Sequence, residues 1–214
     1  KALKVDWFDK LLRTFSEWEK TKSVVFLPVA TESLEVVRAT LEALLRSTFP
    51  AEKLYIVLAG EGRQQAHWQA IQDAVKREFS GRFADLIFST HPPDLPGEII
   101  GKGSNIHYAE YEFKKYADKR GWQYEQIIIS IFDIDTIIHP EYFAHLHFLY
   151  LSHPRPTRSS FQPVTLYNNN IWESHAILRI MAFGTTFWTL FSLARLDNLV
   201  TFSSHSMSFK AVMD

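Results

Sequence analysis

Two carboxylates separated by one residue, Asp133 and Asp135, are the side chains in this sequence best suited to chemistry. On an extended backbone, side chains at positions i and i+2 point the same way. Two carboxylates held close together repel each other unless a cation lies between them. Mg²⁺ or Mn²⁺ accepts one or two carboxylates and completes its coordination with phosphate oxygens and water. The pair therefore predicts a divalent metal bound with a diphosphate. The alternative is a pair of turn aspartates that cap the helix starting near Pro140.

The strand that precedes this pair is the most apolar of the chain, Gln126-Ile-Ile-Ile-Ser-Ile-Phe132. Other short apolar runs rich in β-branched residues predict strands at 23–29, 53–59, 85–90 and 160–165. Helical spacing of apolar residues predicts helices at 33–46, 63–79, 101–119 and 140–151. Strands that alternate with helices predict a single α/β domain, with a mostly parallel central sheet covered by helices on both faces. Ligands bind such sheets beyond the carboxyl ends of the strands, where Asp133 is expected.

The rest of the chain is divided by glycine and proline. Gly60 and Gly62 predict a turn after the strand at 53–59, and the prolines of residues 91–97 predict a loop. An amphipathic helix is expected within residues 1–22, packing on a domain that spans 23–214.

Composition and net charge exclude several kinds of partner and catalytic site. The net charge is −1 and no basic tract is present, so we expect no nucleic-acid partner. The sequence has no cysteine, which excludes disulfides, thiolate zinc sites and cysteine nucleophiles. Its histidines do not have the spacing of a zinc site.

The order of several short motifs resembles the family 2 glycosyltransferases, which have the Rossmann-like GT-A fold. The resemblance covers residues 23–210. The matching segments are Pro28-Val-Ala-Thr-Glu32, Phe49-Pro50, Gly101-Lys-Gly-Ser-Asn105, Asp133-Ile-Asp135 and Pro140-Glu-Tyr142.

The resemblance implies an enzyme that takes a nucleotide-diphosphate sugar through Mn²⁺ or Mg²⁺. It would transfer the sugar, with inversion, to a hydroxyl of a saccharide or lipid-linked acceptor in polysaccharide or glycoconjugate biosynthesis. Because enzymes of this family usually take uridine or guanosine diphosphate sugars, the resemblance implies one of these two nucleotides in the donor.

The resemblance also assigns roles to residues. Thr31 and Glu32 would lie near the nucleotide, and Glu61 stands where the family usually has an aspartate that contacts the base. Lys102 would lie near the nucleotide or its phosphates, Asp133 near the ribose or metal, and Asp135 would be the direct metal ligand. Pro28 and Asn105 complete the expected donor site, and Gln162 and Asn168-Asn-Asn170 fall on the acceptor side.

The resemblance implies a general base beyond Asp214, so we expect the chain to be a truncated catalytic domain of a longer protein. One alternative is a nucleotide-sugar-binding module without catalysis. A haloacid-dehalogenase-like phosphatase is the other, since Asp133-Ile-Asp-Thr136 fits its Asp-x-Asp-x-Thr pattern. That family needs a later acidic pair, which this sequence lacks.

The segment 176–193 is apolar and carries a single charge, Arg179. A spanning helix needs about twenty predominantly apolar residues, and this segment falls short of that. We expect a helix that lies on a membrane surface, with a buried core helix as the alternative. The expected location is the cytoplasm, at the inner face of a membrane.

Overall fold

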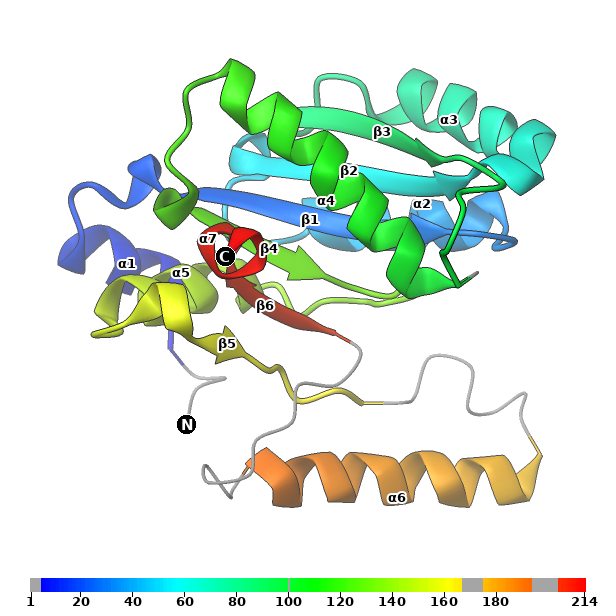
Figure 1. Cartoon of the computed structure of the whole chain (residues 1–214). Coiled ribbons are helices and arrows are strands. Elements are labelled where there is room, and N and C mark those ends of the chain that lie inside the picture. The colour runs from blue at the N-terminus through cyan, green and yellow to red at the C-terminus, as the bar shows by residue number, and fades with distance from the viewer. Residues whose placement is uncertain (1–4, 100, 167–174, 194–203) are drawn as a thin grey trace.

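The computed structural model describes residues 5–99, 101–166, 175–193 and 204–214. Within this part of the chain, six strands form one sheet in the order β3-β2-β1-β4-β6-β5 (Figure 1). Their bounds are β1 Lys22–Val29, β2 Leu54–Glu61, β3 Asp85–His91, β4 Ile127–Ile131, β5 Ser160–Phe161 and β6 His205–Ser208. The first four are parallel, whereas β6 runs antiparallel to both β4 and β5.

Helices cover both faces of this sheet, as the sequence predicts (Figure 1). One face is packed by α4 and α7, whose Phe113 and Phe209 meet Phe26 and Ile129 of the strands. The opposite face is packed by α1, α2, α3 and α5. The helix bounds are α1 Trp7–Thr14, α2 Leu34–Leu45, α3 Gln65–Phe79, α4 Lys102–Lys119, α5 Tyr142–Ser152, α6 Ala176–Leu193 and α7 Phe209–Met213. Because β4 lies inside the sheet with helices on both faces, it is buried at every position.

The N-terminal helix is shorter than predicted. Helix α1 ends at Thr14, and Phe15 caps it in an extended conformation. Trp18 lies in a separate 3₁₀ turn, yet its side chain is buried against Phe8 and Phe49. The apolar spacing thus marks residues that pack on the domain, but not one continuous helix.

The predicted turn at Gly60 is wrong, because β2 continues through Gly60 to Glu61 before the 3₁₀ turn Gly62–Gln64 begins. Glycine is required at position 60 for packing: an added Cβ would lie 2.1 Å from the ring of Trp68. The end of strand β2, which carries Glu61, therefore packs closely against α3.

Helix α6 stands apart from the sheet and its covering helices (Figure 1). Its large apolar side chains are exposed, for example Ile177 at 73% and Phe187 at 70%. Thr189 is the one buried residue of this helix. The alternative of a buried core helix is therefore wrong for this chain. Although this segment is expected from its sequence to fall short of a spanning helix, α6 is, by length and composition alone, long and apolar enough to cross a membrane.

Candidate functional site

A cavity of about 660 Å³ opens at the carboxyl ends of β1, β2 and β4, beside the first turn of α4. This is the edge where parallel sheets bind ligands, and the volume lies within the range typical of small-molecule sites. Its lining residues are Pro28, Val29, Ala30, Thr31, Glu32, Val36, Glu61, Arg63, Gln64, Gly101, Lys102, Asn105, Asp133, Ile134 and Asp135.

The donor-site residues predicted from sequence converge in this one cavity, although they come from four separate segments of the chain. They are Pro28, Thr31, Glu32, Glu61, Lys102, Asn105, Asp133 and Asp135. The parallel register explains the convergence, because it aligns the ends of β1 and β2 and places β4 directly beside β1.

The segment after β1 is folded back on itself. The Glu32 carboxylate accepts a hydrogen bond from the Ala30 backbone N–H at 2.7 Å. The Glu32 carbonyl oxygen lies 2.9 Å from Nε2 of His67 on α3. Thr31, between the two residues of the first contact, lines the cavity.

The backbone at Asp133 and Asp135 is a turn rather than the extended strand expected from the sequence. Strand β4 ends at Ile131, and the Thr136 N–H donates to the Asp133 carbonyl oxygen at 2.9 Å. Ile134, between the two aspartates, is buried and anchors the turn. Both carboxylates nevertheless line the same cavity.

Helix α4 presents its N-terminus to the cavity. Its first residue, Lys102, forms an ion pair with Asp133. Asn105 is buried, and its side-chain amide donates to the Ala59 carbonyl oxygen at 2.9 Å, which ties α4 to β2. The unpaired N–H groups of a helix's first turn and its dipole favour a bound anion such as a phosphate.

The carboxylates of Asp133 and Asp135 are side chains of this cavity that could serve as metal ligands. No group of three or more histidine, aspartate or glutamate side chains that could hold a metal occurs within the described ranges. The two carboxylates of Asp133 and Asp135 instead suit Mg²⁺ or Mn²⁺, which keeps few protein ligands and takes the others from phosphates and water. The residues fit a metal that arrives with a diphosphate.

Gln162 lies away from this cavity. It lines a second hollow of about 350 Å³ with Trp7, Tyr142 and His145, among other residues of α1, α5 and the segment after β5. Its side-chain amide donates to the Ser204 carbonyl oxygen at 2.7 Å. Residues Asn168-Asn-Asn170 lie outside the described residues.

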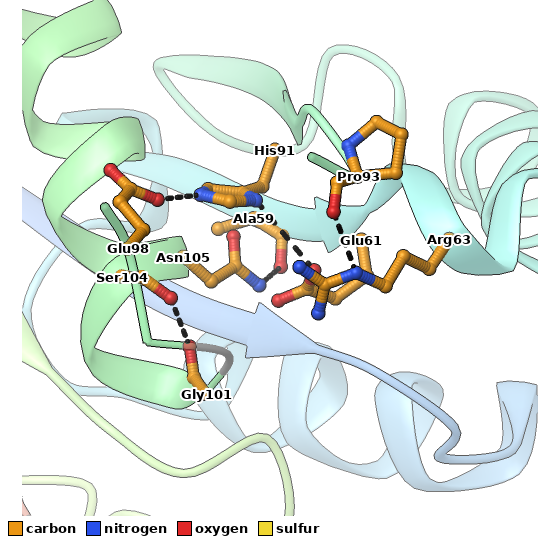
Figure 2. A network of polar contacts seen from close by, with 9 residues as sticks. All are labelled: Ala59, Glu61, Arg63, His91, Pro93, Glu98, Gly101, Ser104 and Asn105. Atoms are coloured by element: carbon orange, nitrogen blue, oxygen red, sulfur yellow. Dashed lines mark hydrogen bonds and ion pairs between the residues drawn. The ribbon is translucent and has the colours of Figure 1, made fainter. Parts of the chain in front are cut away.

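Sequence reasoning missed Arg63 and Gln64, which also line the cavity, and His91 and Glu98 beside it. Arg63 follows the end of β2 by two residues, so its position after a strand was a usable signal. His91 directly follows the strand expected at 85–90, so it carried the same signal, whereas the contact of Glu98 with His91 depends on the path of the chain after β3 (Figure 2).

No model of a known protein family and no curated protein matches this sequence. Among solved structures, the mannosyltransferase PcManGT from Pyrobaculum calidifontis, in complex with GDP-Man and Mn²⁺, matches with a TM-score of 0.51 and 15% identity. That match covers 97% of this chain and 54% of the other. TarS 1-349 of S. aureus matches with a TM-score of 0.43 and 16% identity, over 71% of this chain and 44% of the other. A complex of the same protein with UDP-GlcNAc has a TM-score of 0.41 at 16% identity, over 71% and 43% of the two chains.

The chain spans about half the length of the solved structures that it matches. The match to the mannosyltransferase shows the fold: this chain has the α/β fold of the GT-A glycosyltransferases, with a six-stranded, mostly parallel sheet.

Proposed function

We propose that this chain is the donor-binding domain of a glycosyltransferase that takes a nucleotide-diphosphate sugar with Mn²⁺ or Mg²⁺. The observation that carries the proposal is the convergence of Glu61, Lys102, Asp133 and Asp135 in one cavity at the carboxyl edge of a GT-A sheet. The neighbour with the same fold is a mannosyltransferase in complex with GDP-Man and Mn²⁺, which supports a donor of this class.

In such a transfer, the oxygen of an acceptor hydroxyl forms a bond to the anomeric carbon while the bond to the diphosphate breaks, and the hydroxyl proton passes to a general base. Negative charge grows on the departing diphosphate. A bound divalent metal supplies charge neutralisation there. Asp133 and Asp135 would hold that metal, and the Lys102 ammonium and the N-terminus of α4 would stabilise the phosphate oxygens. With the acceptor attacking from the opposite side, transfer proceeds with inversion.

Other roles follow from the placement of residues around the cavity. Pro28, Thr31 and Glu32 would border the nucleoside, and Glu61 would face the base from the end of β2. Asn105 would act by fixing the start of α4 to β2 through its bond to Ala59. On this assignment, the second hollow at Gln162 is the acceptor side, for a saccharide or lipid-linked hydroxyl.

The experiment that tests the proposal is release of UDP or GDP from nucleotide sugars with Mn²⁺ and saccharide acceptors. Release by the native protein that is lost in Asp135→Asn would support it. Binding without release would favour the alternative, a nucleotide-sugar-binding module. The absence of both binding and release would overturn the proposal.

We further propose that α6 contacts a membrane, at the cytoplasmic face. Three of its hydroxyls are satisfied within the helix: Thr185, Thr186 and Thr189 donate to the carbonyl oxygens of Met181, Ala182 and Thr185, at 2.9, 3.2 and 2.9 Å. A lipid environment offers no partners to polar groups, so internal satisfaction suits it. The exposed apolar side chains of α6 would be the contact surface.

A further inference from the structure

The segment between β4 and α5, residues 132–141, carries both carboxylates of the candidate metal site and is held by α2. Near its start, the Thr40 hydroxyl of α2 donates to the Ile134 carbonyl oxygen. Near its other end, the Pro140 carbonyl oxygen accepts from the Ser47 hydroxyl, just beyond α2, at 2.9 Å. The first of these contacts lies between the two aspartates, whereas the second lies well beyond them.

Thr40 is the one polar side chain among the buried residues of α2. The others are Val37, Leu41, Ala43 and Leu44. A hydroxyl buried among apolar groups is costly unless it is hydrogen-bonded. Valine has nearly the same shape as threonine and would carry no such cost, so the hydroxyl itself needs an explanation. Its bond to Ile134 provides one.

The direction of the Thr40 bond is a second unusual feature. Within a helix, a serine or threonine hydroxyl can donate to the carbonyl four residues earlier, as Ser152 does to Phe148. Thr40 instead donates to a residue 94 positions later in the chain. Both partners are buried, with Thr40 2% exposed and Ile134 3% exposed. A tertiary bond in place of a local one therefore ties α2 to the turn of the two aspartates.

Two peptide units connect Asp133 to Asp135, and the oxygen of each is held. The Asp133 carbonyl oxygen accepts from the Thr136 N–H at 2.9 Å, and the Ile134 carbonyl oxygen accepts from Thr40. Because a peptide unit is planar, holding its oxygen restricts the orientation of the whole unit, including the N–H and Cα of the next residue. The Thr40 bond therefore acts on the unit that leads into Asp135.

We propose that Thr40 is a positioning residue of the donor site: its hydroxyl fixes the peptide unit between Ile134 and Asp135, so that the carboxylates of Asp133 and Asp135 face one metal ion. Thr40 is not among the residues that line the cavity, so it acts through the turn. Mg²⁺ demands ligands near ideal octahedral positions, and groups that orient metal ligands contribute about 10- to 100-fold to metal affinity. This inference rests on the proposed function, since it assumes a metal-bound diphosphate in the cavity.

The test is calorimetric titration of the Mn²⁺ complexes of UDP, GDP and inorganic pyrophosphate into the native protein and three variants of Thr40. Thr40→Val and Thr40→Ala remove the hydroxyl, and both should weaken binding of each complex that the native protein binds by at least about tenfold. Thr40→Ser should bind within about threefold of the native protein, because its hydroxyl still donates. A role in packing alone would give the opposite order, since valine keeps the shape of threonine and serine loses its methyl group.

Two controls separate positioning from general effects. Ser47→Ala removes a bond of the same kind to the same segment, and its acceptor at Pro140 keeps the Thr48 N–H at 3.0 Å. Ile71→Val lowers stability by shortening a buried side chain of α3. Both should bind as the native protein does. Thermal unfolding shows which variants are folded during the titration, and either Thr40→Val or Thr40→Ala alone suffices for the comparison.

The negative results are distinguishable. Native affinity in a folded variant without the hydroxyl, binding by Thr40→Ser as weak as that of Thr40→Val, or an equal loss in either control would overturn the inference and leave the proposed function standing. If the native protein binds none of the three Mn²⁺ complexes, the proposed function fails, and the inference fails with it.

Discussion

Lys102, the first residue of α4, and Asp133, two residues beyond β4, form an ion pair across the mouth of the candidate donor cavity. Their side chains are 38% and 42% exposed, so the pair lies in solvent-accessible surroundings. Exposed pairs of this kind contribute at most about 1 kcal/mol to folding. A pair that adds little stability, at a cavity bordered by a second carboxylate, is better explained by a ligand's charges than by the fold.

Replacing Lys102 separates these two explanations. We expect Lys102→Ala to weaken binding of UDP or GDP about tenfold, since it removes one charge-assisted contact to phosphate. The free energy of unfolding, measured with denaturant, should stay within about 0.5 kcal/mol of the native value. Lys115→Ala, an exposed lysine on the same helix, is the control and should change neither quantity. A loss of stability without a loss of binding would assign Lys102 to the fold.

His147 predicts a pH dependence of stability that is independent of the donor site. It is fully buried, neither ring nitrogen has a partner among the described residues, and burial lowers the pKa of His147 to about 3. The unfolded chain, with a histidine pKa near ~6.5, binds more protons between about pH 3 and 6.5. The free energy of unfolding should therefore increase as the pH rises through that window and decrease as the pH falls through it.

His147→Leu tests this directly. The leucine packs against Phe49 without a group to protonate, so it should stabilise the protein more at pH 4.5 than at pH 7.5, by on the order of 2 kcal/mol. Denaturant unfolding at both pH values measures the difference. His107→Leu, at an exposed position on α4, serves as the control. Equal effects of His147→Leu at the two pH values would contradict the account.

Helix α6 predicts binding to lipid vesicles. The protein should float with vesicles of phosphatidylcholine, with little effect of added phosphatidylserine or salt, because α6 carries only one charged side chain. The double substitution of Phe183→Glu and Phe187→Glu, at residues 59% and 70% exposed, should abolish flotation. Tyr111→Glu, 54% exposed on α4, is a matched control that should float as the native protein does. Flotation that survives the double substitution would count against membrane contact through α6.

The parallel part of the sheet could be predicted from the sequence because its strands are continuous apolar runs. Strand β1 at Lys22–Val29 matches the expected 23–29, and β4 at Ile127–Ile131 lies within 126–132. The antiparallel β6 could not be predicted in this way. Its Ser206 and Ser208 are fully buried, and Ser206 is satisfied by hydroxyl contacts with Ser130 at 2.7 Å and Tyr142 at 2.8 Å. A strand whose buried positions are serines has no apolar pattern, so its sequence resembles that of a loop.

The grouping of the predicted site residues in one cavity could be expected from the sequence, whereas the contacts within that cavity could not. Asp133 and Glu61 each follow an apolar strand, and strand ends share one edge of a parallel sheet. The turn at Ile134 was expected only as the alternative, in which the two aspartates cap the next helix, and that helix has no side-chain cap hydrogen bond. Tertiary contact fixes the turn instead, because the Ile134 carbonyl oxygen accepts from buried Thr40 of α2. The approach of His91 to Glu61 depends on the register of β2 and β3, which local sequence does not specify.

The central claim is that Asp135 helps to hold a metal-bound diphosphate, and calorimetric titration of UDP and GDP tests it most directly. We would titrate each nucleotide into the native chain and into Asp135→Ala, with and without Mn²⁺. The account predicts binding that requires Mn²⁺ and disappears in Asp135→Ala, while both proteins unfold at the same temperature. Binding of equal strength in the two proteins, or no dependence on Mn²⁺, would contradict the assignment of Asp135 and the donor site built around it.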